Sequence, residues 1–430
     1  MKRKFTLPLA LFGLLCFTKN VDAQFYMLGP QVTASDVNNS GLVGAKAGAS
    51  ENYYWTPSGG LQHIGSLGVN TLSGQTLVSE NNDKIYAYMT NPETGNNSAA
   101  IYTISTASWN FLADLGGSMD NSATSPWGLS NDGSHLVGLG SLADGRAHAV
   151  RWNAAGEITD IGSTVEGRYS RANAVNNDGS VVVGWQDGTT GTRQGAIWVN
   201  GNQTILTDNE GNSLGEAGAV SGDGTVVVGL SGLYPYVWTE NSYTTITHPQ
   251  SGAFFRGGAT GITEDGSTVI GYFRGWPGGP HFGEGFIWTA ENGRQELNQY
   301  VQNLGIDTQG YVLALPLSIS PDGTKIAGIA RGNDGGQYGF YVDMADYLNT
   351  SDETIISKQY KLYPNPVSDV LSIEGLNQPS TIEITNMIGQ KIKSEETTSG
   401  KINVQSLPKG NYIITINDGK STTNHKFIKK

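Results

Sequence analysis

The sequence repeats AVNNDGSVVVG (residues 174–184) as AVSGDGTVVVG (residues 219–229). Five weaker copies of the same pattern lie before and after these two. The final residue of each copy recurs at a spacing of roughly 45 residues, which is typical of the short-stranded blades of a β-propeller. The closing residues are Gly44, Ala87, Gly138, Gly184, Gly229, Gly271 and Gly328. The sequence therefore predicts seven repeated units.

Each unit divides into four expected strands. The residues before Asp-Gly form the first strand, and Val-Val-Val-Gly forms the second. We expect Asp-Gly to make a two-residue hairpin, because type I′ turns require positive φ at both central residues. A third strand with an aromatic end follows, for example at Trp152 or Trp198, and a Gly/Asn turn leads to the fourth. The fold class is therefore predicted as all-β, with a seven-bladed β-propeller over residues 24–345.

The two ends of the repeat array do not match. The seventh unit has three expected strands, whereas FYMLG (residues 25–29) has the pattern of a fourth strand and stands ahead of the first unit. A strand without a neighbour leaves a row of unpaired backbone groups. We therefore predict that the N-terminal strand completes the last blade and closes the ring.

The N-terminus has the features of a secretory signal peptide. Basic residues 2–4 precede an apolar run over residues 5–17, and Val21-Asp22-Ala23 offers small residues for cleavage after Ala23. The apolar run is too short to span a bilayer, which takes about 20 residues. Residues 1–23 are therefore predicted to be removed. A lipoprotein anchored through Cys16 is the alternative.

Charge and cysteine content exclude several kinds of protein. The chain has a net charge of −12, and its basic residues are sparse between residues 24 and 357, which argues against nucleic acid as a partner. Cys16 is the single cysteine, so disulfide frameworks and thiolate metal sites are excluded from the mature chain. No later stretch reaches the length of a transmembrane helix. The polar run NTSDET (residues 349–354) and a reversal of charge after it predict a linker over residues 346–358.

The basic segment after the linker has a pattern of its own. YPNPV (residues 363–367), IEITN (residues 382–386) and LPKGNYIITI (residues 407–416) predict a small Ig-like β-sandwich over residues 359–430. The order and spacing of these motifs resemble the C-terminal sorting domain of the type IX (Por) secretion system of Bacteroidetes. An ordinary Ig-like appendage is the alternative. The residues that carry the resemblance are Tyr363, Pro364, Asn365, Pro366, Gly389, Gly410 and Tyr412.

That resemblance implies a cellular address and a partner. The type IX machinery would carry the protein across the outer membrane, and the protein would be secreted or held at the cell surface. The repeats also resemble an extracellular family named for its His-Ala-Phe signature, on AHAVRW (residues 147–152) and RGNDGG (residues 331–336). This second resemblance covers residues 26–343 and implies a propeller without naming an activity.

Candidate ligand-binding residues gather in the long connections between strands two and three and between successive units. A rigid scaffold usually places its binding residues in such loops. Arginine beside aromatic rings can bind an acidic or planar partner by paired hydrogen bonds and stacking. We expect an extracellular glycan or protein as ligand, although packing between blades could also explain these residues. The candidates are Arg168, Tyr169, Arg171, Trp185, Arg193, Phe255, Arg256, Arg274, Trp276, His281 and Arg331.

Catalysis and cofactors find little support in the sequence. It contains no His-Glu-x-x-His and no Gly-x-Ser-x-Gly nucleophile elbow. We expect a binding protein without cofactors, with calcium at the Asp-Gly turns or at DNEGN (residues 208–212) as a weaker alternative. A polysaccharide lyase or glycosidase that uses His281, Tyr169, Arg274 and Glu166 is a further possibility, and a structural surface-layer component is the third.

Overall fold

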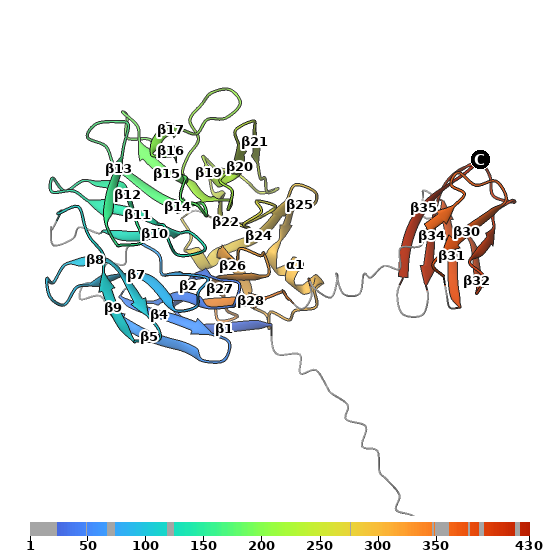
Figure 1. The fold of residues 1–430 in the computed structure, drawn as a ribbon, viewed down its shortest axis with the longest axis horizontal. Coiled ribbons are helices and arrows are strands. Elements are labelled where there is room, and N and C mark those ends of the chain that lie inside the picture. The colour runs from blue at the N-terminus through green and yellow to red at the C-terminus, as the bar shows by residue number, and fades with distance from the viewer. Residues whose placement is uncertain are drawn as a thin grey trace, which may run out of the picture. The chain divides into compact units, whose positions relative to one another are not determined.

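The computed structural model describes residues 24–48, 50–66, 74–117, 124–275, 277–345, 348, 361–376, 379–386, 391–417 and 422–430. The chain divides into two compact units between Met344 and Ala345, and each is described by itself. Figure 1 shows that both consist almost entirely of strands. None of the helices in the described residues is long and apolar enough to cross a membrane. The predicted signal peptide, residues 1–23, lies outside the described residues, as does most of the predicted linker.

The first unit contains seven four-stranded antiparallel sheets. The first sheet comprises β2(Val32–Val37), β3(Val43–Ala47), β4(Glu51–Thr56) and β5(Gly60–Ser66). The second comprises β6(Leu77–Val78), β7(Lys84–Thr90), β8(Asn97–Thr103) and β9(Ser108–Phe111). The third comprises β10(Ser125–Leu129), β11(Leu136–Ser141), β12(Ala147–Trp152) and β13(Ile158–Gly162). The next two comprise β14(Ser170–Val175), β15(Val181–Asp187), β16(Arg193–Val199) and β17(Asn202–Ile205); and β18(Ala217–Val220), β19(Val227–Ser231), β20(Tyr234–Thr239) and β21(Ser242–Thr245). The sixth comprises β22(Phe255–Ile262), β23(Thr268–Gly275), β24(Gly283–Thr289) and β25(Gly293–Glu296), and the seventh β26(Val312–Ile319), β27(Lys325–Arg331), β28(Gln337–Asp343) and β1(Phe25–Pro30). The short helices η1(Pro280–Phe282) and α1(Leu297–Asn303) lie in connections.

The seven sheets follow one another in a closed circle. Each sheet packs against the next through the first strand of that next sheet, and β2 of the first sheet packs against β27 of the last. The circle is visible in Figure 1, where the orange strands β26, β27 and β28 lie beside the blue strands β1 and β2. This arrangement is propeller-like, with the first strand of every sheet nearest the centre.

The N-terminal strand closes the circle as predicted. β1 pairs antiparallel with β28, from Phe25 opposite Val342 to Pro30 opposite Tyr338. Phe25 and Leu28 are buried, so the strand adds apolar contacts as well as backbone hydrogen bonds. The last sheet is thus built from both ends of the repeat array.

The Asp-Gly turns differ from the prediction. In the loop between β14 and β15, Gly179 has a φ of +73°, whereas Asp178 is not among the residues with positive φ. The Asp178 carboxylate instead accepts a hydrogen bond from the Ser180 backbone N–H at 2.9 Å. The Asn176 N–H donates to the Val181 carbonyl, which leaves four residues in the loop. The predicted two-residue type I′ hairpin is therefore wrong, because the aspartate side chain stabilises a longer turn that needs positive φ at glycine alone.

The closing glycine of the repeat is explained by a bulge in the first strand. The register of β14 against β15 shifts between Ala172 and Ala174, so Asn173 is the extra residue. A Cβ atom on Gly184 would lie 2.0 Å from the Arg171 carbonyl oxygen. The same kind of shift occurs in β2, β10, β18, β22 and β26. A bulge turns its extra side chain out of the regular alternation, and here that side chain faces the centre.

The tryptophans at the ends of the third strands join neighbouring sheets. Trp152 and Trp198 are fully buried. The Trp152 indole N–H donates to the Ala113 carbonyl at 2.8 Å, and that of Trp198 donates to the Ile161 carbonyl at 2.9 Å. Both carbonyls belong to the preceding sheet or its outgoing loop. These residues therefore pack between sheets.

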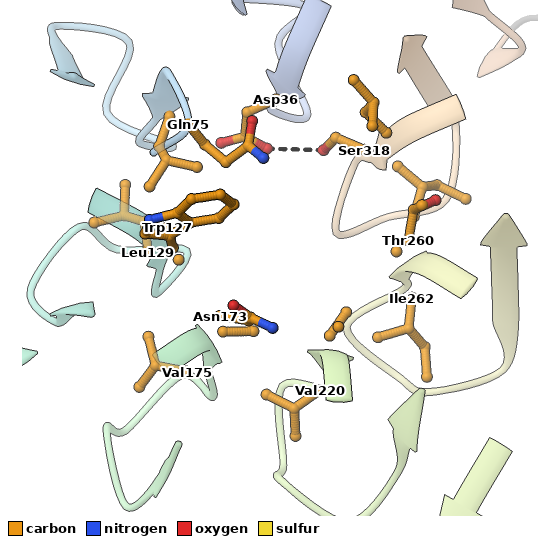
Figure 2. A pocket seen from close by; sticks show the side chains of 18 of the residues that line it. Asp36, Gln75, Trp127, Leu129, Asn173, Val175, Val220, Thr260, Ile262 and Ser318 are labelled. Atoms are coloured by element: carbon orange, nitrogen blue, oxygen red, sulfur yellow. Dashed lines mark hydrogen bonds between the residues drawn. The ribbon is translucent and has the colours of Figure 1, made fainter. Parts of the chain in front are cut away.

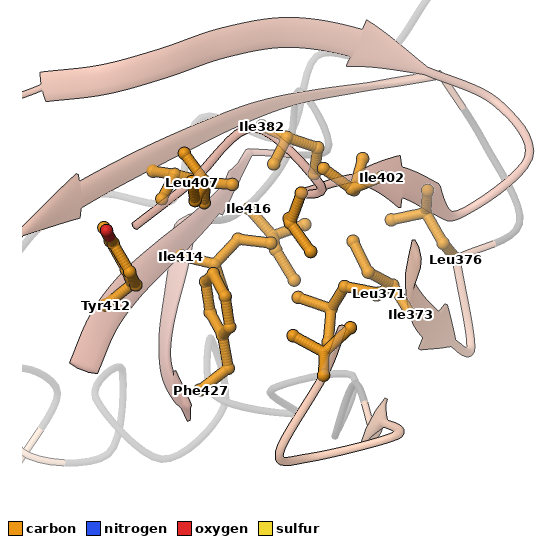
Figure 3. Close-up of a cluster of buried hydrophobic side chains, with 13 residues drawn as sticks. Leu371, Ile373, Leu376, Ile382, Ile402, Leu407, Tyr412, Ile414, Ile416 and Phe427 are labelled. Carbon is orange, nitrogen blue, oxygen red and sulfur yellow. The ribbon is translucent and has the colours of Figure 1, made fainter. Parts of the chain in front are cut away.

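The second unit has two sheets around one core. One contains β29(Lys361–Tyr363), β30(Val370–Glu374) and β33(Lys401–Asn403), and the other β31(Ser380–Asn386), β32(Lys391–Thr397), β34(Gly410–Asn417) and β35(Thr422–Lys429). Figure 3 shows Leu371 and Ile402 of the first sheet meeting Ile382 and Ile414 of the second in this core. The two-sheet arrangement follows from the alternating apolar residues of these strands.

The residues of the sorting motif have different places in this unit. Tyr412 is buried, stacks on Phe427 and donates its hydroxyl to the Pro408 carbonyl at 2.9 Å. The Asn365 side chain accepts the Ile428 N–H at 2.9 Å, whereas Tyr363 is 52% exposed. Gly410 begins β34. Gly389 lies outside the described residues.

Candidate functional site

A cavity of about 340 Å³ lies at the centre of the first unit. The first strands of all seven sheets line it, and Figure 2 shows their side chains converging on one space. The lining includes the bulge residues Trp127, Asn173 and Thr260. At one end of every sheet the first strand begins and the second strand finishes, and we call this end the loop face. We call the opposite end the turn face. The cavity extends between these two faces.

On the turn face, backbone hydrogen bonds connect neighbouring sheets around the cavity. The backbone N–H groups of Glu80, Asn177, Gly222 and Glu264 donate to a carbonyl of the next sheet's turn, at 2.8–3.1 Å. The Glu80 carboxylate accepts the Asn39 N–H at 3.1 Å. Burial raises the pKa of Glu80, and the charges of Asp36, Asp322 and Glu264 add to that rise. These groups serve to connect the sheets.

Asp36 lies on the cavity wall and links three sheets. Its carboxylate accepts the Ser318 hydroxyl of β26 at 2.7 Å and the Val78 N–H of β6 at 2.9 Å. Figure 2 shows the bond to Ser318. Burial raises the pKa of Asp36 to about 6, and these hydrogen bonds oppose the rise only in part. Among the described residues, no cationic nitrogen lies within 4.0 Å of it.

On the loop face, three of the predicted residues meet at the mouth of the cavity. Arg171 and Arg193 both bind the Glu216 carboxylate, at 2.5 and 2.7 Å. The Arg171 guanidinium lies 3.6 Å from the Trp127 ring centroid, and that of Arg193 lies 3.7 Å from the Trp185 ring. Burial lowers the pKa of Arg171, and the charge of Glu216 opposes this effect. The cluster is rigid because each cation is held by both a carboxylate and a ring.

A second pair of predicted arginines lies at the same mouth, on the sixth sheet. Arg256 of β22 is directly opposite Arg274 of β23. The Arg274 guanidinium lies 5.5 Å from the ring of Tyr272, which lines the cavity. Burial raises the pKa of Tyr272, and the positive charges of Arg274 and Arg256 oppose that rise. Within the described part of the chain, no carboxylate lies within 4.0 Å of Arg274.

The other predicted residues are distributed around the loop face. Arg331 donates to the His281 carbonyl at 3.0 Å, and its guanidinium lies 6.0 Å from the Phe282 ring. Arg168 donates to the Thr189 carbonyl, and Tyr169 is exposed. Phe255 stacks on Phe273 and packs against His248, within the sheet core. Trp276 lies outside the described residues.

Exposed aromatic side chains also favour the loop face. Phe254 is 79% exposed and Phe282 is 52% exposed. Both lie in loop-face connections of the sixth sheet, before β22 and between β23 and β24. Tyr169 is exposed on the same face. The large apolar residue exposed at a turn-face connection is Val199, at the end of β16.

The cavity residues Trp127, Asn173, Glu216 and Tyr272 were not among the candidates from the sequence. Trp127 stands at the bulge position, where other units carry Asn173, Gly218 and Thr260. The available signal was a tryptophan at a repeat position that is otherwise Ser35, Asn173, Gly218, Thr260 or Leu317. Its meaning depends on the bulge, which the sequence did not predict.

The possible catalytic group is not assembled. Glu166 and Tyr169 lie near Arg146 of the third sheet. The pKa of Arg146 is raised mainly by its hydrogen bond to Asp144, and the charges of Glu166 and Tyr169 add to that rise. His281 packs on Phe282, and its carbonyl binds Arg331 of the seventh sheet. The four residues therefore belong to different neighbourhoods of the loop face. The geometry offers no common reaction centre for them.

One group of described residues could in principle hold a metal ion. The ligand atoms of His248, Glu284 and Glu296 lie within 4.8 Å of one another. However, His248 Nδ1 accepts the Gln250 N–H at 3.1 Å, so the proton of the neutral ring is on Nε2, which faces the carboxylates. A metal-bound histidine normally donates from its other ring nitrogen. The group therefore fits a hydrogen-bonded structural role.

The predicted calcium loop is occupied by internal contacts. The Asp208 carboxylate accepts the backbone N–H groups of Glu210 and Asn212, at 3.0 and 2.8 Å. It also accepts the Asn212 side-chain amide at 3.0 Å. These bonds form a compact turn around one carboxylate.

Comparison with known proteins bears on both units. Residues 361–430 match the family described as "Secretion system C-terminal sorting domain". This match indicates export by the type IX secretion system to the cell surface or beyond. No curated protein matches the chain in sequence.

Several solved structures are similar to this chain at low sequence identity. A putative TolB from Agrobacterium tumefaciens is 10% identical with a TM-score of 0.40, covering 73% of this chain and 90% of that chain. An oligogalacturonate lyase in complex with manganese is 14% identical with a TM-score of 0.47, covering 75% and 93%. The extracellular domain of the one-component system BT4673 from B. thetaiotaomicron is 13% identical with a TM-score of 0.41, covering 95% and 58%. At these values no ligand or activity transfers to this chain.

Proposed function

We propose that this protein is an extracellular binding protein that engages its ligand at the loop face of the first unit. The observation that carries the proposal is the gathering of arginine and exposed aromatic residues on the loop face, where the central cavity has one mouth. Phe254 and Phe282 expose large apolar surfaces in loop-face connections. Arg171 lines the cavity, Arg193 binds the lining residue Glu216, and Arg274 lies beside the lining residue Tyr272. Rigid scaffolds usually carry binding residues in loops of this kind.

The size of the cavity supports a small ligand or the end of a chain-like one. Small-molecule sites are concave and typically occupy about 300–1,000 Å³. The cavity of about 340 Å³ falls in that range. Of the two expected ligand classes, a glycan fits such a hollow better than a protein, whose interfaces are broad and usually bury about 800 Å² per partner.

The finer architectural assignments belong to the same proposal. Each four-stranded sheet of the circle is taken as one blade of a seven-bladed β-propeller, built from repeats of the His-Ala-Phe type. The second unit is taken as an Ig-like sandwich that serves as the sorting domain of a Bacteroidetes protein. A signal peptide over residues 1–23, a propeller over residues 24–345, a linker over residues 346–358 and a sorting domain over residues 359–430 complete the organisation.

A direct test uses the mature chain on a glycan array, followed by calorimetric titration of each glycan that binds. Replacing Phe254 and Phe282 by alanine should weaken binding about tenfold or more, because both rings are exposed and their loss removes contact area without opening the core. Val199→Ala is the matched control, since Val199 is 44% exposed on the turn face. Binding that survives the double replacement but falls with Val199→Ala would place the site on the other face and refute the proposal.

A further inference from the structure

The charges at the cavity mouth oppose those of the rest of the chain. The protein carries a net charge of −12. Nevertheless, Arg171, Arg193, Arg256 and Arg274 lie around this mouth with Glu216 among them. Glu216 binds the first two of these arginines, and within the described residues no carboxylate lies within 4.0 Å of Arg274.

The second pair places two like charges directly opposite each other on neighbouring strands. Like charges directly opposite each other on neighbouring strands destabilise a sheet. Arg256 lies directly opposite Arg274 in this way. In the described part of the chain, Arg274 has no carboxylate within 4.0 Å. Its guanidinium lies 5.5 Å from the centroid of the Tyr272 ring. A bound anion between the two guanidinium groups would turn this repulsion into attraction.

We infer that the mouth binds the anionic groups of an acidic glycan, a polysaccharide that carries carboxylate or sulfate groups. This inference rests on the proposed function and names its ligand class. Arg256 and Arg274 would hold the anionic group by paired hydrogen bonds, which the planar guanidinium provides and lysine does not. The phenol of Tyr272 lies beside them as a further donor.

The surroundings favour a sugar as the carrier of the anion. Phe254 and Phe282 offer exposed flat rings on the same sheet, against which a sugar ring can lie. The Gln75 side chain points into the cavity, and among the described residues it makes no side-chain hydrogen bond, so its amide can serve a hydroxyl group. The acidic remainder of the body would repel a polyanion elsewhere and confine it to this mouth.

The experiment measures the Kd of the mature full-length chain for three probes: alginate oligosaccharides, dextran sulfate and neutral dextran. We expect at least one charged probe to bind and neutral dextran not to bind. Arg274→Gln should weaken that binding about tenfold or more, because hydrogen bonds to charged groups contribute about 1.5–3 kcal/mol. Arg274→Lys should give an intermediate loss, since it keeps the charge but not the paired geometry.

Arg151→Gln is the matched control. It removes the same charge from β12, near the turn face, where Arg151 lies opposite Thr159. The midpoint of thermal unfolding, recorded for every variant, establishes that the arginine variants are folded. Tighter binding of alginate would identify the anionic group of the ligand as a carboxylate, and tighter binding of dextran sulfate would identify it as a sulfate.

Two results would overturn the inference. One is equal binding of neutral dextran and both charged probes, and the other is an equal loss of affinity with Arg274→Gln and Arg151→Gln. In either case the proposed function would still stand if Phe254 and Phe282 were required for binding. Loss of the acidic-glycan assignment is therefore distinguishable from loss of the loop-face site.

Discussion

Asp36 shows how a single side chain can connect the circle at a cost in stability. Its carboxylate binds Ser318 of the last sheet and Val78 of the second sheet, so it bridges the junction at which the circle closes. Burial without a nearby cation disfavours the charged form and raises its pKa to about 6. Because the pKa in the folded protein exceeds the ordinary aspartate pKa of 3.8, the stabilising contribution is complete below pH 3.8 and is lost as the pH rises through about 6.

We predict that Asp36→Asn removes this pH dependence. The stability of the wild type relative to the variant should fall by about 3 kcal/mol between pH 3.5 and pH 7, since each pKa unit corresponds to about 1.4 kcal/mol. Urea unfolding of both proteins across this range measures the difference, and the contributions of the other carboxylates cancel. Parallel curves for the two proteins would contradict the raised pKa.

At the scale of the element, the repeated bulge determines both the closing glycine and the cavity lining. The bulge at Asn173 brings the Arg171 carbonyl under Gly184 and directs the Asn173 side chain toward the cavity. Gly138 and Gly229 have the same relation to Ser125 and Glu216. Glycine is therefore required by a close backbone approach, and not by positive φ.

We predict that Gly184→Ala destabilises the first unit by about 2–3 kcal/mol, the usual cost of forcing an extra methyl group into a packed interior. The new Cβ would meet backbone, which cannot move aside as a side chain can. Gly252→Ala is the control, because its Cβ would come no closer than 3.9 Å to the Gln250 carbonyl. Denaturant unfolding measures both. Equal stability of the two variants would show that the bulge does not approach Gly184 this closely.

At the scale of the whole first unit, both ends of the repeat array meet in one sheet. β1 covers the edge of β28, which would otherwise expose a row of unpaired backbone groups. Phe25 and Leu28 are buried by this pairing. The circle is thus held closed by hydrogen bonds and apolar contacts between residues more than three hundred positions apart in the sequence.

We predict that deleting residues 24–30 lowers the free energy of unfolding by about 5 kcal/mol or more, since two large apolar side chains lose their burial and β28 loses its partner. Deleting residues 93–95, an exposed turn between β7 and β8, should cost far less. Calorimetry of the two truncated proteins compares them. If both unfold at the same temperature, the N-terminal strand does not close the circle.

The sequence by itself determined the features that depend on local pattern. Turn residues at a regular spacing specified the repeated four-stranded sheets, an unmatched strand pattern specified the closure by β1, and a tail motif specified the export route. It also pointed to the residue types of the candidate site, because arginine and aromatic residues recur in the loop-face connections. These signals are carried by residues close together in the chain.

The tertiary structure decided which of those residues meet. Arg171 and Arg193 are bound to Glu216, Phe255 belongs to a sheet core, and Arg256 faces Arg274. The bulges that turn Trp127 and Asn173 toward the cavity arise from backbone register, and the repeat marks them only indirectly, through its closing glycine. Pairing between residues of different sheets depends on how those sheets pack around the centre. That packing is a property of the whole circle, and a local stretch of sequence does not contain it.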